Sequence, residues 1–132
     1  MGDLAISLAM KEQILLVGTG VSRERGTVLF RRGDPVAGIY LIRSGTISLV
    51  LEGANHSFPT RLLGAGSVVG LPATMAGSPY SLTAEVIQDA ELTFVAREVL
   101  LECLRQQPAL CFEVMELLSR EISGTREAVK RR

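Results

Sequence analysis

Glycines set between apolar-rich segments constrain this chain more than any other feature. Three such segments lie within residues 26–51: Thr27–Phe30, Ile39–Ile42 and Thr46–Leu51. A turn signal at residues 33–35 separates the first two, and Ser44-Gly45 separates the second from the third by the length of a tight hairpin. Glycine takes a positive φ without a steric penalty, so Gly26, Gly33 and Gly45 fall where a β chain has to change direction. We therefore expect a compact antiparallel sheet here.

The same pattern of short strands and turns continues to Ala96. Further strands are predicted at His56–Leu63, Ser67–Val69, Ser81–Val86 and Ala90–Ala96. Val21–Arg25 fits either an edge strand or a loop, and Gly70–Ala76 is predicted to form a single helical turn opened by Pro72. Several short strands at near-regular spacing with glycine-rich turns are typical of a β-sandwich or jelly roll.

Helical periodicity flanks this β region. Asp3 is predicted to cap a first helix through about Val17, and the period changes again after Arg97, where Glu98–Arg105 and Pro108–Lys130 are predicted helices. The expected fold class is mainly β with flanking helices, a double-stranded β-helix or jelly roll. We expect one domain over residues 1–132, with an N-terminal helix (1–18), a β-roll (19–96) and C-terminal helices (97–132).

The last predicted helix carries an apolar stripe at three- and four-residue spacing: Leu110, Val114, Leu117, Leu118 and Ile122. Two alternatives account for the stripe. It packs on the domain's own sheet, or it pairs with the same helix of a second copy. The helix is longer than one face of so small a β domain needs, which favours the homodimer.

Composition narrows the classes of function. The chain has 14 basic and 14 acidic residues, so it has no electrostatic footprint for nucleic acid. Two cysteines, Cys103 and Cys111, without a secretory signal predict a cytoplasmic protein, and the longest uncharged stretch contains too many glycines and prolines to cross a membrane. A single histidine, His56, cannot assemble a histidine-rich metal site, although one haem ligand stays conceivable. No nucleophile elbow, phosphate loop or carboxylate pair stands out, so we expect no catalytic residue, no metal and no enzyme.

A family resemblance follows from residues within the segment 26–51: Gly26, Leu29-Phe30, Gly33-Asp34, Tyr40, Ile42, Gly45 and Ile47. Their order resembles the first half of the cyclic-nucleotide-binding domain of the Crp/Fnr type, and with the flanking helices the likeness extends over Met10 to Lys130. In that family the C-terminal helix is the dimer seam, and transcription factors of this type continue into a winged helix-turn-helix. Here the chain stops within a few residues of the helix. We therefore expect no direct DNA binding by this chain, and any DNA contact would come from a partner chain or a larger gene product.

The resemblance also implies where a ligand would bind. In the family a short helix offers backbone N–H groups to the cyclic phosphate, a Glu next to a Gly takes the ribose hydroxyl, and an Arg about ten residues later pairs with the phosphate. Aligned on Gly70, this sequence has Leu71 in place of that Glu and Tyr80-Ser81 in place of Arg-Ser, with one residue fewer between. Pro72 also removes an N–H donor. Without either charged group, tight binding of cyclic AMP or cyclic GMP is not expected, while weak retention by backbone donors stays open.

The candidate ligand-binding residues of this degenerate cassette are Gly70, Leu71, Pro72, Ala73, Tyr80, Ser81, Leu82 and Thr83. An apolar pocket is predicted from Leu63, Val69, Leu71, Met75, Tyr80 and Leu82, and the alternative is that these residues simply fill the interior of the roll. The leading hypothesis is a non-enzymatic regulatory or sensor domain, with no cofactor, whose small-molecule effector is apolar or weakly anionic. The alternatives are a ligand-free dimeric interaction module or a fragment of a Crp/Fnr-type transcription regulator. A void beside Leu71, Tyr80 and Thr83 favours sensing, and filled space favours the interaction module.

Overall fold

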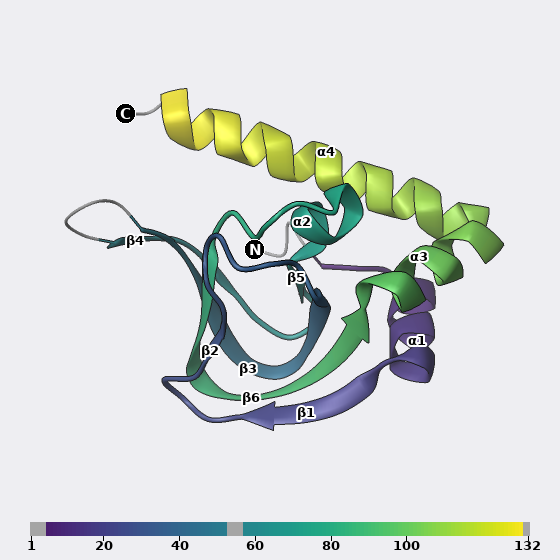
Figure 1. Ribbon diagram of the computed structural model, residues 1–132, viewed down its shortest axis with the longest axis horizontal. Coiled ribbons are helices and arrows are strands. Elements are labelled where there is room, and N and C mark those ends of the chain that lie inside the picture. The colour runs from purple at the N-terminus through teal and green to yellow at the C-terminus, as the bar shows by residue number, and fades with distance from the viewer. Residues whose placement is uncertain (1–4, 53–56, 131–132) are drawn as a thin grey trace.

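The computed structural model describes the backbone of residues 5–52 and 57–130 and the side chains of residues 5–51 and 61–120. Helices lie at the two ends of the chain and strands between them (Figure 1). The elements are α1 (Leu8–Val17), β1 (Thr19–Arg23), β2 (Val28–Phe30), β3 (Gly38–Glu52), β4 (Ser57–Leu63), β5 (Val68–Val69), α2 (Leu71–Ala76), β6 (Thr83–Ala96), α3 (Arg97–Gln106) and α4 (Pro108–Lys130).

The strands form one antiparallel sheet with the order β1-β6-β3-β4, to which β2 adds on β6 and β5 adds on β3. The long strands β3 and β6 curl together into a roll, and the helices lie along one side of it (Figure 1). The predicted fold class, mainly β with flanking helices, is confirmed. The segment Val21–Arg25 was predicted to be either an edge strand or a loop, and the structure shows an edge strand, β1, over Thr19–Arg23.

The predicted hairpin at Ser44-Gly45 is wrong, because β3 runs through it as one strand. Both halves of β3 pair with β6, and the register shifts on either side of Gly45. Gly45 has φ +92°, and an added Cβ there would lie 2.4 Å from the carbonyl oxygen of Asp89. The two last predicted strands are likewise one strand, β6, which continues through residues 87–89 opposite this irregularity. The glycine therefore bends a continuous ladder, as a bulge does, instead of reversing the chain.

Helix α1 begins later than its sequence predicts. Its cap is Ser7, whose hydroxyl accepts a hydrogen bond from the Met10 N–H at 3.2 Å. The predicted cap, Asp3, lies outside the described residues. Ser7 also donates to the carboxylate of Glu113 in α4, from its N–H at 2.7 Å and from its hydroxyl at 2.6 Å. The first helix is thus fixed to the last one at its N-terminus.

Strand alternation divides the buried side chains into two cores. Along β3, Ile42 points into the roll, where the interior core gathers residues of all the longer strands. Ile39 and Leu41 point to the other side, where α1, α3 and α4 cover the sheet. The roll interior and the helical layer are therefore separated only by the sheet itself, and α2 touches both cores through Ala73 and Leu71.

Candidate effector cassette

Helix α2 is held at both ends by glycines in the left-handed region. Gly70, its N-cap, has φ +89°, and its carbonyl accepts hydrogen bonds from Thr74 N–H at 3.1 Å and Thr74 Oγ1 at 2.7 Å. An added Cβ at Gly70 would lie 3.1 Å from the Gly38 carbonyl and 3.2 Å from the ring of Tyr80. The backbone at the start of α2 therefore lies directly against the residue that stands where the family has Arg.

Tyr80 is buried and fully bonded. Its ring stacks on that of Phe30 with centroids 3.7 Å apart and planes 10° from parallel. Its hydroxyl donates to the Gly38 carbonyl at 2.7 Å and accepts from the Ala37 and Gly38 N–H groups, both at 3.1 Å. Its main chain pairs with the turn before that loop, because Gly33 N–H donates to the Tyr80 carbonyl and Tyr80 N–H donates to the Asp34 carbonyl. Tyr80 thus anchors residues 33–38, through its main chain at Gly33 and Asp34 and through its hydroxyl at Ala37 and Gly38.

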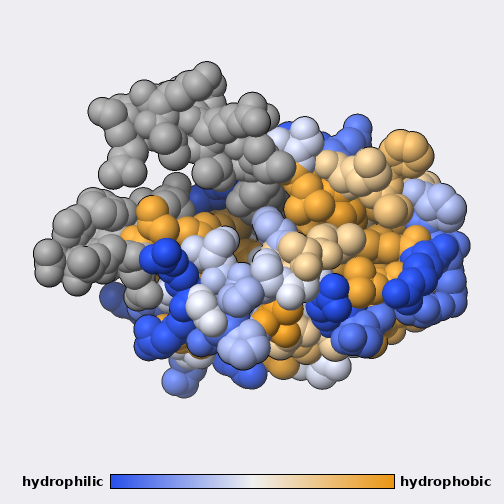
Figure 2. Space-filling view, turned by 45° about the horizontal axis from the view of Figure 1, so that its top comes forward, coloured by the Kyte–Doolittle hydropathy of each residue, from blue (hydrophilic) through white to orange (hydrophobic). Residues whose placement is uncertain are grey.

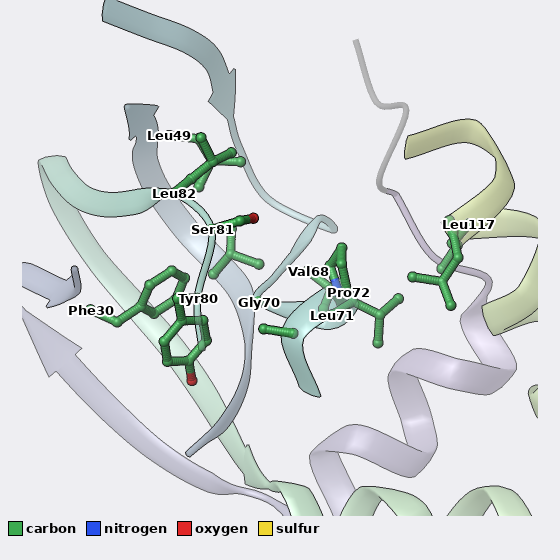
Figure 3. Close-up of a pocket in the computed structure, with 13 residues that line it drawn as sticks. Phe30, Leu49, Val68, Gly70, Leu71, Pro72, Tyr80, Ser81, Leu82 and Leu117 are labelled. Carbon is green, nitrogen blue, oxygen red and sulfur yellow. The ribbon is translucent and has the colours of Figure 1, made fainter. Parts of the chain in front are cut away.

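The space left beside Tyr80 is a cavity of about 40 Å³. Figure 3 shows the Phe30 and Tyr80 rings face to face on one side of Gly70, with Leu71, Pro72 and Leu117 on the other. Thirteen residues line it: Phe30, Leu49, Val68, Val69, Gly70, Leu71, Pro72, Ala73, Tyr80, Ser81, Leu82, Leu117 and Leu118. None of these thirteen carries a charge, and their polar side chains are those of Tyr80 and Ser81. A cavity of this size holds a few water molecules at most.

Seven of the eight candidate ligand-binding residues line this cavity, so the structure brings the predicted cassette together. The eighth, Thr83, lies at the start of β6, where its hydroxyl accepts a hydrogen bond from Arg32 N–H at 3.0 Å. Two residues of the predicted pocket lie elsewhere, because Leu63 packs in the roll interior and Met75 packs on the helical layer.

Five lining residues were not predicted: Phe30, Leu49, Val68, Leu117 and Leu118. Leu49 follows the inward alternation of β3, a signal that the sequence does carry. Leu117 and Leu118 come from α4, and only the packing of that helix over α2 brings them to the cassette (Figure 1).

Arg97, the first residue of α3, joins the cassette to the helical layer. Its N–H donates to the Ala37 carbonyl at 3.0 Å, next to the Tyr80 hydroxyl, and its Nε donates to the Thr74 carbonyl of α2 at 2.8 Å. The guanidinium lies over Gly77, the C-cap of α2, where φ is +71° and an added Cβ would come 2.8 Å from an Arg97 nitrogen. Arg97 therefore ties both Tyr80's loop and α2 to the start of the C-terminal helices.

The predicted dimer stripe on α4 needs a correction. Leu110, Val114 and Leu117 are buried in the helical core of their own chain, with Leu117 1% exposed, so these three are not free to line a seam with a second copy. Leu118 is half-buried at the edge of that core, and the side chain of Ile122 lies outside the described residues. The first turns of α4 thus follow the alternative reading, packing on the domain itself.

Two general properties of the described residues bear on function. They contain no group of three or more His, Cys, Asp or Glu side chains arranged to hold a metal ion; His56 lies outside them. Among the same residues, no helix has both the length and the hydrophobicity required to cross a bilayer.

The fold and the cassette together define a class: a β-roll with a short internal helix and a C-terminal helix laid over it. The family model of the cyclic nucleotide-binding domain matches residues 21–107, so the chain belongs to this family, and its relatives are of the Crp/Fnr type. The resemblance read from the glycine pattern is thereby confirmed.

Curated relatives are regulators about twice as long. The fumarate and nitrate reduction regulatory protein of Vibrio cholerae is 30% identical over 107 residues, which cover 80% of this chain and 42% of that protein. The anaerobic regulatory protein of Bacillus subtilis is 28% identical over 127 residues, covering 95% of this chain and 53% of that protein. The chain therefore spans about half the length of these relatives.

Solved structures share the fold at lower identity. The catabolite activator protein of Thermus thermophilus superimposes with a TM-score of 0.84 at 22% identity, over 95% of this chain and 59% of that one. A cyclic nucleotide-binding domain from Methylobacillus flagellatus gives 0.76 at 21% identity, over 96% and 72%.

Proposed function

We propose that this chain is a non-enzymatic regulatory domain that does not bind cyclic AMP or cyclic GMP tightly. The observation that carries this proposal is the Tyr80 side chain, which stacks on Phe30 and bonds to Gly38 beside the start of α2. A cyclic phosphate needs positive charge or several free donors, and neither the phenol nor Leu71 supplies them.

The volume of the cassette supports the same proposal. Pockets that enclose a small ligand usually measure roughly 300–1,000 Å³, and the cavity here measures about 40 Å³. The sequence left three functions open, and between two of them, a sensor of a small apolar effector and the ligand-free interaction module, a cavity this small favours the interaction module. Arg97 would then serve to hold the C-terminal helices in one fixed position.

Titration calorimetry with cyclic AMP, cyclic GMP and cyclic di-GMP tests the proposal. We expect no heat of binding at micromolar concentrations of any of them. The Ser81→Ala variant is the matched control, because it removes the remaining polar side chain of the cavity without touching the fold's core. Micromolar binding of either mononucleotide by the unaltered chain refutes this account of Leu71 and Tyr80.

We also propose a homodimer through α4, with a seam turned away from the residues buried in the chain's own core. Met115 is 58% exposed, and it belongs to a series spaced alternately by four and three residues: Cys111, Met115, Leu118, Ile122, Thr125 and Val129. A repeat of this kind is the seam of a two-stranded coiled coil. Of the five residues of the predicted dimer stripe, Leu118 and Ile122 belong to this series, and Thr125 and Val129 continue both patterns more weakly.

Disulfide cross-linking tests this seam. In a background with Cys103→Ser and Cys111→Ser, Met115→Cys should form a covalent dimer on mild oxidation, because seam residues of paired helices face each other. Glu116→Cys is the control, since it is exposed on the next position around the helix. Equal cross-linking of the two variants, or a monomer in sedimentation, overturns the dimer.

The remaining assignments are that residues 1–132 act as one domain, that the protein works in the cytoplasm, and that this chain makes no direct DNA contact. The last rests on the balance of 14 basic and 14 acidic residues. Salt-sensitive binding of duplex DNA by the chain alone would contradict it.

A further inference from the structure

Helix α1 is attached to the rest of the domain by few apolar contacts. Met10 and Ile14 are its buried residues, and Ile6, just before the helix, packs against the same helical core. Other large side chains of α1 are open to water, with Leu8 69% and Leu16 75% exposed. Figure 2 shows apolar surface open to solvent on the half of the molecule where α4 begins, and Figure 1 places α1 in that half. Elements with few buried contacts are the ones that open locally in a folded protein.

Polar contacts hold the N-terminal end of this segment. Residues 5–6 pair with the turn at residues 66–67 of the roll, through a β-bridge and a backbone hydrogen bond of 3.1 Å. Directly after them, Ser7 donates twice to the carboxylate of Glu113 in α4, from its N–H at 2.7 Å and from its hydroxyl at 2.6 Å. A carboxylate is a stronger acceptor than a neutral carbonyl. The pair of bonds to Glu113 is therefore the contact that closes the start of α1 onto α4.

The C-terminal end of α1 is fixed to the sheet more firmly. An added Cβ at Gly18 would lie 2.5 Å from Cγ2 of Thr93 and 2.8 Å from the carbonyl oxygen of Phe94, so the backbone lies directly on β6. Thr19, the next residue, begins β1 and pairs with Phe94. An isolated helix of ten residues is marginal in water. Once its N-terminal contacts open, α1 is thus expected to leave the core and unfold, while β1 stays in the sheet.

We propose that residues 5–17 form a lid over the helical core that opens as one unit while the roll stays folded, and that the two hydrogen bonds from Ser7 to Glu113 are its latch. Val68 and Leu71 belong to this core and also line the cassette. The lid therefore helps to bury the core from which one wall of the cassette is built. Its opening requires neither a nucleotide in the cassette nor a second copy at α4, so the inference goes beyond the proposed function and does not depend on it.

Native-state hydrogen exchange tests whether the lid opens as a unit. The N–H groups of residues 11–17 should exchange at one common rate, at least about a hundredfold faster than those that pair β3 with β6. Low concentrations of urea should leave this rate nearly unchanged, because a local opening exposes little surface. Glu113→Ala removes the latch and should raise the α1 rate by about tenfold. Glu116→Ala, exposed on the same helix, is the matched control and should leave it unchanged.

A second variant separates opening of the lid from unfolding of the roll. Gly33 has φ +91° with open space around it, so Gly33→Ala strains the roll and should speed exchange in β3 but not in α1. Cys103 gives an independent readout, because its Sγ–H donates to Oε1 of Gln13 in α1 at 3.4 Å. In the Cys111→Ser variant, Glu113→Ala should speed alkylation of Cys103 by about fivefold, and Gly33→Ala should not. An unchanged α1 or Cys103 rate in Glu113→Ala, or equal acceleration of α1 and β3 in both variants, overturns the proposal.

Discussion

Two hollows among the described residues differ in charge, volume and openness: the cassette beside α2, and a groove between α1 and α3 that is lined by Gln13, Val17, Glu98, Val99, Glu102, Cys103, Gln106 and Gln107. The lining of the cassette is uncharged, its cavity measures about 40 Å³, and the stacked rings of Phe30 and Tyr80 occupy one side of it. The groove is open, about 350 Å³ in volume, and edged by two carboxylates. The site inherited with the fold is thus the less available of the two.

The difference teaches that a conserved architecture and a usable pocket are separate properties. Tyr80 is hydrogen-bonded to residues 33–38 through its hydroxyl and its main chain, and its ring lies against Gly70 at the start of α2. Polar groups of a binding site that are satisfied within the chain have nothing left to offer a solute.

Removing the Tyr80 ring should have the largest effect on the stability of the fold. Tyr80→Ala deletes a buried ring and leaves the Gly38 N–H without its partner, so we expect a loss of about 3–5 kcal/mol in the free energy of unfolding. Val99→Ala, at the groove, should change it by less than about 0.5 kcal/mol. Urea denaturation measures both. Similar losses in the two variants would mean that the hollows do not differ in packing.

Removing only the phenol oxygen sharpens the comparison. Tyr80→Phe keeps the stack on Phe30 but leaves the Ala37 and Gly38 N–H groups without an acceptor, which should destabilise the fold by about 1–3 kcal/mol. Gln13→Ala in the groove is its counterpart and should be nearly neutral in the same denaturation series. If Tyr80→Phe left the free energy of unfolding unchanged, stacking on Phe30 alone would account for the position of the ring.

The contact of Arg97 with α2 should appear as a difference in stability between two glycine-to-alanine substitutions. Gly77→Ala forces a left-handed alanine and displaces the guanidinium, whereas Gly66→Ala, at φ +92°, meets no atom within 4 Å. We expect a loss of about 1–2 kcal/mol from strain in both, and a further loss in Gly77→Ala alone. Arg97→Ala should abolish that excess, because the clash partner is gone. If the two glycine substitutions cost the same stability in the protein that keeps Arg97, the contact between Arg97 and α2 would be contradicted.

The smallest expected effect concerns the thiol in the groove. Burial raises the pKa of Cys103, so the folded protein holds less thiolate at a given pH than the unfolded chain does. In the Cys111→Ser variant, alkylation at pH 8 should be slower than in urea by a factor on the order of three, and its rate should keep rising above the ordinary thiol midpoint. A folded thiol with the midpoint of the unfolded one would show that the groove is more open than its lining indicates.

Much of the fold could be predicted because each element carries its own local signal. The glycines predicted to change the direction of the chain, at 26, 33 and 45, do have positive φ, and Pro108 does begin the last helix. The hairpin at Gly45 was predicted wrongly since a glycine that reverses a chain and a glycine that bends a strand look alike locally. Only the pairing of both halves of β3 with β6 distinguishes them.

The sequence predicted most of the residues that line the candidate site, but not which side chains fill the space between them. Alignment on Gly70 selected seven residues that do line the cavity, yet the sequence could not reveal that Phe30 fills the space beside Tyr80. Likewise, the spacing of the α4 stripe is correct for a helix, but which edge of it faces the domain depends on tertiary packing over α2. Long-range contacts of this kind leave no trace in a local window of sequence.

The phenol of Tyr80 is attached to the chain it stabilises. A tethered group has an effective concentration fixed by geometry, so neither dilution nor metabolism can withdraw it as they withdraw a diffusible messenger. Under the proposed ligand-free function, the strength of the output would therefore follow the number of copies of the protein, and its synthesis and degradation would control that output.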